Sequence, residues 1–236
     1  VNGYATPQIT AEQMAQWAAD LTYVSCFSYG YSMNGDLAAI NDENLIFQAE
    51  SSGVAPLMVL TPFDETGKYS YELVREVFTN PLMRDRLINN VVLTATDKNY
   101  YGVVFNFGYI AEEDNQQFVI TVSKSAARLN RRGKLVIVSI ITGLNDAGID
   151  YEALGRAANF IELRTFRVEQ NQGSPAAISP LDRLRETVSE VAALVDPRFI
   201  LLGLPNYGYD WVLPHVQGRT AAETVSNVEA AERARR

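Results

Sequence analysis

Acidic side chains are the groups in this sequence best suited to chemistry, because the chain has one histidine, His215, and one cysteine, Cys26. A nucleophile–histidine system would have to use His215, and no Gly-x-Ser-x-Gly motif accompanies it. Zinc sites need several histidine or cysteine ligands, and neither a Gly-x-Gly-x-x-Gly motif nor a phosphate-binding loop occurs. We therefore expect no metal and no cofactor, and carboxylates remain as the candidate general acids or bases.

Two groups of acids lie near the ends of predicted strands. Glu112, Glu113 and Asp114 follow an apolar strand, at the position where barrel enzymes build their active sites. Acids also complement the dipole at a helix N-terminus, and we predict that role for these three. Glu162 and Glu169 flank another predicted strand, and a replacement acid from this segment is the alternative.

The segment 100–109, Tyr-Tyr-Gly-Val-Val-Phe-Asn-Phe-Gly-Tyr, is a predicted strand that combines an apolar face with a small, uncharged one. The two-residue period of a strand puts four aromatic or branched residues on the first face: Val103, Phe105, Phe107 and Tyr109. The opposite face has no ionisable group and consists of Gly102, Val104, Asn106 and Gly108. We predict that the first face packs outward on helices and that the second points into a barrel.

This strand resembles the catalytic strand of glycoside hydrolase family 18, the family of chitinases and peptidoglycan hydrolases, which reads Asp-x-x-Asp-x-Asp-x-Glu. Tyr101 matches the first position, as in the spore-cortex-lytic branch, whose strand is similar to Tyr-Gly-Val-Asn-Ile-Asp-Phe-Glu. Against that branch, Val104 replaces the Asn, Asn106 the Asp and Gly108 the Glu. The family uses the substrate's N-acetyl group as nucleophile and one Glu as general acid. The resemblance therefore implies the scaffold without the acid, since glycine cannot donate a proton.

Two further segments extend the resemblance. Segment 160–167 lies where the family has Met-Thr-Tyr-Asp or Met-Thr-Tyr-Glu, so that Phe166 lacks the tyrosine hydroxyl and Arg167 reverses the acid's charge. Segment 200–211, followed by Leu-Pro, resembles the spore-lytic Gly-Ile-Pro-Leu-Tyr-Gly-Tyr-Asp-Trp. Aromatic rings stack on the apolar faces of sugars. The residues expected to contact a glycan are Tyr207, Trp211, Tyr29 and Asn106.

Apolar strand-like runs alternate with helical patterns along the whole chain, which is typical of βα units around a parallel sheet. The expected strands are 1–4, 21–29, 55–61, 100–109, 134–140, 160–167 and 200–211. The expected helices are 11–20, 42–51, 71–97, 113–130, 151–158 and 181–195, with a last helix over 220–236 opened by Thr220 and Glu223. We predict a single (β/α)8 TIM-barrel-like domain over 1–236 that lacks its eighth strand. C-terminal truncation, or a protein partner at the open barrel edge, would account for the gap.

The net charge and the hydropathy pattern indicate which classes of binding partner to expect. The net charge of −8 disfavours nucleic acid, which needs clustered Lys and Arg. No apolar run of about 18 residues predicts a membrane span, and no signal peptide occurs in this chain. The resemblance implies an extracellular, cell-wall or spore-surface location.

The function that the resemblance implies is that of a catalytically inactive family-18-like protein. It would bind an N-acetylglucosamine-containing polymer such as chitin or peptidoglycan, or serve as a structural protein at a spore or cell surface. One alternative is a weak or altered hydrolase of chitin or peptidoglycan that uses an acid outside the usual strand. Another is a protein-interaction scaffold with a filled cleft.

Overall fold

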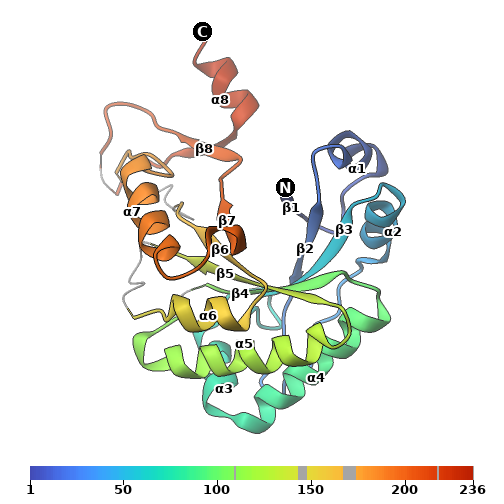
Figure 1. Ribbon diagram of the computed structural model, residues 1–236. Helices are drawn as coiled ribbons and strands as arrows, with labels where there is room; N and C mark the ends of the chain where they lie inside the picture. Colours follow the sequence, from blue (N-terminus) through green and yellow to red (C-terminus); the bar gives the residue numbers. More distant parts are fainter. Residues whose placement is uncertain (109, 143–147, 167–173, 217, 236) are drawn as a thin grey trace.

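A computed structural model describes the chain except for residues 109, 143–147, 167–173, 217 and 236. Seven parallel strands form one curled sheet in chain order (Figure 1): β1 (Asn2–Ala5), β2 (Tyr23–Tyr29), β3 (Ala55–Leu60), β4 (Gly102–Gly108), β5 (Leu135–Ile141), β6 (Phe160–Arg164) and β7 (Ile200–Gly203). The helices between them are α1 (Ala11–Ala18), α2 (Glu43–Ser51), α3 (Tyr71–Thr79), α4 (Pro81–Asp97), α5 (Asn115–Asn130), α6 (Tyr151–Ala157) and α7 (Leu181–Ala192). The alternation confirms the predicted TIM-barrel-like α/β fold with one strand fewer than a closed barrel.

The predicted helix over 71–97 is wrong in one respect, because it is two helices divided at Asn80. Pro81 has no N–H with which to continue the hydrogen-bond ladder of α3. The Asn80 side chain then caps α4 by accepting hydrogen bonds from the backbone N–H groups of Leu82 and Met83, each at 3.2 Å.

The C-terminal predictions are also corrected. The seventh strand ends at Gly203, and Tyr207–Asp210 forms a separate strand, β8, paired antiparallel with β9 (Glu223–Ser226). Pro205 cannot donate to a strand ladder, so the chain leaves the sheet before it reaches Tyr207.

The helix predicted over 220–236 begins later, as α8 (Asn227–Arg233). Its cap is Ser226, whose hydroxyl accepts from the Glu229 N–H at 3.1 Å, and not Thr220. The β-branched Thr224 and Val225 favour the strand that precedes it. We call β8, β9 and α8 together the C-terminal arm; in Figure 1 it extends above β7 to the C-terminus at the top.

The sheet separates a large outer core from a small inner one. Val103, Phe105 and Phe107 belong to the outer core, where Phe107 contacts the rings of Phe78 and Phe118 on the helices, at centroid distances of 5.7 and 5.9 Å. The inner core consists of Leu57, Val59, Val104 and Ile137, all with no exposed surface. The predicted outward and inward faces of β4 are therefore confirmed for Val103 to Phe107, and Tyr109 lies outside the described residues.

The edges of the curled sheet are β1 and β7, which have no strand partner on their outer sides within the described part of the chain. Large apolar side chains near both edges are exposed: Tyr4 (41%), Trp17 (44%), Phe199 (45%), Leu202 (42%) and Leu204 (68%). The seam between the edges is thus bordered by apolar surface.

Candidate functional site

Polar side chains replace apolar ones in the half of the barrel interior toward the carboxyl ends of the strands. Inward positions alternate along a strand, and those that follow the inner core are Thr61 after β3, Asn106 on β4, Ser139 on β5, and Glu162 and Arg164 on β6. Tyr4 from β1 and Ser28 from β2 join them through hydrogen bonds. We call these seven residues the polar layer, and barrel folds build their sites at this end.

Glu162 is the buried acid of the polar layer, with 5% of its surface exposed. Its Oε2 accepts hydrogen bonds from the Tyr4 and Ser139 hydroxyls, each at 2.5 Å. The side chain of Tyr4 is partly exposed at the sheet edge, but its hydroxyl is directed at Glu162. Desolvation of that hydroxyl, and then the charge of Glu162, raise the pKa of Tyr4 far above its usual range, so Tyr4 remains a donor. Two donors directed at one oxygen fit a carboxylate acceptor better than a catalytic proton donor.

Asn106 stands where the family has the Asp beside its general acid, and both ends of its amide are engaged. Its Oδ1 accepts from Nη2 of Arg164, and its Nδ2 donates to Thr61 Oγ1 at 3.1 Å. Ser28 Oγ donates in turn to the same Thr61 oxygen at 2.6 Å. Asn106 therefore fixes the guanidinium of Arg164.

Gly108, at the family's Glu position, has a backbone that disfavours a side chain. Its φ is +71°, and a Cβ there would lie 3.1 Å from the Tyr69 hydroxyl oxygen. The Tyr69 hydroxyl donates to the Phe107 carbonyl at the end of β4. The register with β5 also shifts between Phe105 and Gly108. Gly108 thus has a backbone conformation that glycine adopts readily and other residues do not.

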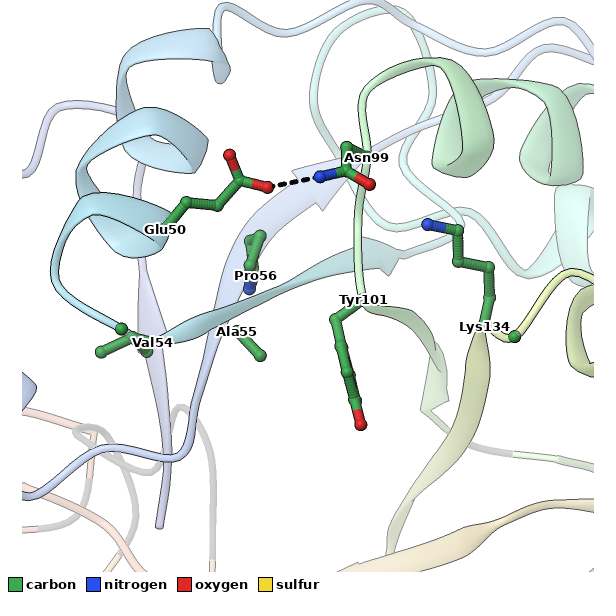
Figure 2. Close-up of a pocket in the computed structure, with 9 residues that line it drawn as sticks. Glu50, Val54, Ala55, Pro56, Asn99, Tyr101 and Lys134 are labelled. Atoms are coloured by element: carbon green, nitrogen blue, oxygen red, sulfur yellow. Dashed lines mark hydrogen bonds between the residues drawn. The ribbon is translucent and has the colours of Figure 1, made fainter.

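Tyr101, at the first motif position, lies at the opposite end of the barrel from Gly108. It borders a pocket of about 370 Å³ together with Lys134 and a Glu50–Asn99 hydrogen bond of 2.6 Å (Figure 2). Its half-exposed ring points away from that pair and packs against Tyr23, with centroids 5.8 Å apart. The structure therefore does not bring Tyr101 to the polar layer.

Tyr29, one of the residues expected to contact a glycan, is buried on the helical side of the sheet, away from the polar layer. Only 2% of its surface is exposed, and its hydroxyl donates to the buried carboxylate of Asp42 on the helical side of the sheet. Strict alternation from Tyr23 would turn Tyr29 inward, but the register of β2 shifts between Cys26 and Tyr29. Such an irregularity reverses the face of the residues that follow it.

Of the other expected site residues, Tyr207 lies on β8 and Trp211 directly follows β8, and both are partly exposed. The ring centroids of Trp211 and His215 are 5.4 Å apart. Phe166 lies against Gly203 of β7: a Cβ added to Gly203 would be 3.4 Å from Cε1 of the Phe166 ring. Arg167 and Glu169 fall outside the described residues.

The acids at 112–114 take the predicted place at a helix N-terminus. Glu112 and Glu113 are exposed on the short 3-10 helix η1 (Glu112–Asp114), which leads directly into α5. Within the described ranges, no group of three or more His, Cys, Asp or Glu side chains could hold a metal ion. No helix of the described chain is long and apolar enough to cross a membrane.

Arg164 is the charged residue of this site that the sequence patterns did not identify. A two-residue period from Phe160 puts Glu162 and Arg164 on one face of the strand, and that pattern could have identified both. The partner of Arg164 on β4 lies 58 positions away in sequence, and no local pattern predicts it.

A curled parallel sheet with polar groups at the carboxyl ends of its strands defines the class of (β/α)-barrel proteins. No family model matches the sequence. YdhD of Bacillus subtilis (strain 168), whose name assigns it to the sporulation-specific glycosylases, is 29% identical over 236 residues, 98% of this chain and 56% of the relative. This chain spans about half the length of the curated relatives it matches.

The solved structure of a relative gives the family, and a second structure is similar to the chain. The crystal structure of YdhD matches with a TM-score of 0.81 and 30% identity over 89% of this chain and 71% of that one. The spore cortex-lytic enzyme SleL of Bacillus megaterium QM B1551 matches with a TM-score of 0.88 and 29% identity, over 99% of this chain and 56% of that one. The chain belongs to glycoside hydrolase family 18, the family of chitinase-like glycosylases.

Proposed function

We propose that this protein binds an N-acetylglucosamine-containing glycan, such as chitin or peptidoglycan, without hydrolysing it, at a spore or cell-wall surface. The observation that carries the proposal is Gly108, which stands at the general-acid position and has a left-handed backbone. Asn106 supports it, because an amide engaged by Arg164 and Thr61 cannot take the role of the family's Asp. The names of the relatives, a glycosylase and spore cortex-lytic enzymes, indicate the glycan class.

Hydrolysis assays test the loss of catalysis. We expect no release of reducing ends from chitin oligomers or peptidoglycan, because losing general acid catalysis alone lowers the rate by roughly 10²–10⁴. The altered-hydrolase alternative predicts turnover that disappears in Glu162→Gln, Glu112→Gln, Glu113→Gln or Glu169→Gln. Turnover that is lost in one of these variants would reject the proposed loss of catalysis and support the altered hydrolase.

Glycan titration tests the retained binding. Tyr207 on β8 and Trp211, which follows β8, are partly exposed, and aromatic rings stack on the apolar faces of sugars. We expect Trp211→Ala to weaken binding of N-acetylglucosamine oligomers by up to about tenfold, or ~1.4 kcal/mol. Phe47→Ala is the matched control, because Phe47 is 69% exposed on α2.

Near-UV circular dichroism establishes that each variant folds. Unchanged binding in a folded Trp211→Ala variant rejects the stacking role. If the wild type does not bind the oligomers at millimolar concentration, the proposed glycan binding is rejected. The protein-interaction scaffold then remains as the candidate function.

The scaffold function is the second candidate, and the open edges of the sheet favour it. Unpaired strands recruit other strands, and apolar side chains border both β1 and β7, among them Trp17 and Leu202. A partner that supplies an apolar strand to this seam is the protein partner consistent with these edges.

A further inference from the structure

We propose that Arg164 makes this site prefer a glycan that carries a carboxylate, such as a sugar with a lactyl ether or a uronic acid, over a neutral one. The inference rests on the proposed glycan binding and names the ligand class of the same site.

The position of Arg164 is set by its neighbours on two strands. It is the last residue of β6, and its side chain crosses the inner face of β5 to donate from Nη2 to Asn106 Oδ1 on β4. Its stem lies over Gly203 of β7, where a Cβ would be 2.8 Å from Arg164 Cγ. The guanidinium is therefore held over the barrel interior, near the carboxyl ends of the strands.

The charge of Arg164 has no carboxylate partner in the described part of the chain, where none of the ion pairs includes this residue. Its hydrogen-bond acceptor is the neutral amide oxygen of Asn106, and its Nε is buried without a partner. A guanidinium has five N–H donors in a planar fork that fits a carboxylate in a bidentate manner. A partly buried cation with unused donors is better stabilised by an anion than by a neutral amide.

Glu162 does not take the place of that anion. Its Oε2 is occupied by Tyr4 and Ser139, and it lies two residues before Arg164 on β6, deeper in the barrel. A ligand that enters from the carboxyl ends of the strands therefore meets the guanidinium before it meets the acid. The polar layer presents a cation where the family presents carboxylates to a neutral acetamido group.

Paired ligands that differ only in charge test the inference. The probes are the disaccharide of N-acetylglucosamine and N-acetylmuramic acid with a free lactyl carboxylate, the same disaccharide with that group converted to an amide, and a neutral N-acetylglucosamine oligomer. Calorimetric titration at low salt should give at least tenfold tighter binding of the acid than of the amide. Raising the salt concentration should reduce this ratio, because screening weakens charge pairing at a partly exposed site.

Three variants assign the preference to Arg164. Arg164→Met should bring the acid-to-amide ratio to about one, and Gly203→Ala should lower it by displacing the arginine stem. Arg198→Ala is the matched control: Arg198 is exposed and paired with Asp196 outside the polar layer, so the ratio should stay at the wild-type value. If Arg164→Met does not fold, Arg164→Gln serves the same purpose.

The possible failures are distinguishable. Equal binding of acid and amide by the wild type overturns the carboxylate preference and leaves glycan binding intact. A preference that persists in folded Arg164→Met or Arg164→Gln overturns the role of Arg164. If the wild type binds none of the three ligands, the proposed function fails and this inference fails with it.

Discussion

Gly108, which the resemblance aligns with the family's general acid, has a backbone conformation that disfavours any side chain. A side chain at φ +71° is strained, and a Cβ would also press on Tyr69. The partners of a restored glutamate are absent as well, since Asn106 carries no charge and Phe166 has no hydroxyl. The effects of mutating catalytic groups that act together are far from additive, so restoring one of them does not restore its share of the rate.

We predict that Gly108→Glu produces no chitinase activity and lowers the free energy of unfolding by more than the roughly 1–2 kcal/mol of left-handed strain. Gly133→Ala is a matched control, because Gly133 has φ +69° and no atom near its missing Cβ. Gly108→Ala should cost more than Gly133→Ala in urea unfolding, and the difference measures the contact with Tyr69. Strong hydrolysis by Gly108→Glu would show that the other losses are not disabling.

At the scale of elements, α2 is joined to β2 and α4 by a buried carboxylate. Asp42, the residue before α2, accepts hydrogen bonds from Tyr29 and Tyr100 and pairs with Lys98. Burial alone would raise the pKa of Asp42, but the hydrogen bonds from Lys98, Tyr100 and Tyr29 outweigh it, and the pKa falls below its usual 3.8. Burial raises the pKa of the neighbouring Cys26 to about 11, so this thiol is an unreactive part of the core.

Because the folded-state pKa of Asp42 is lowered, its contribution to stability is present above its unfolded pKa and is lost as the pH falls below about 4. We predict that Asp42→Asn lowers the free energy of unfolding by roughly 3 kcal/mol at pH 7, since it leaves Lys98 without its buried partner. The loss should shrink toward pH 3 in chemical denaturation. Asp85→Asn, which breaks an exposed pair with Lys124, should change stability by less than about 1 kcal/mol. Equal losses in the two variants would contradict the special role of Asp42.

At the scale of the whole molecule, the sheet curls without closing. Each edge exposes a row of backbone groups beside apolar side chains, and such edges associate with other chains. We predict concentration-dependent self-association in sedimentation velocity, reduced by Leu202→Lys or Trp17→Lys at the edges. Leu82→Lys is the control, because Leu82 is 85% exposed on α4 and lies away from both edges. A protein that stays monomeric at all concentrations would show that the edges are protected.

The sequence by itself determined the order of strands and helices, the apolar outward face of β4, and the absence of acids at 104, 106 and 108. These features depend on residue type and on a two-residue or 3.6-residue period, which neighbouring residues specify locally. The same local patterns failed at 200–226, where Pro205 ends the strand and β9 supplies a partner from farther along the chain.

Only the tertiary structure decided which groups meet inside the barrel. Alternation assigns a residue to a face, but a register shift in β2 turned Tyr29 to the helical side, and another in β4 accompanies the left-handed Gly108. The contact between Arg164 and Asn106 requires three strands to curl until residues 58 positions apart share one interior. The physical reason is that strand register and sheet curvature are set by packing across the whole sheet, while periodicity reports only on adjacent residues.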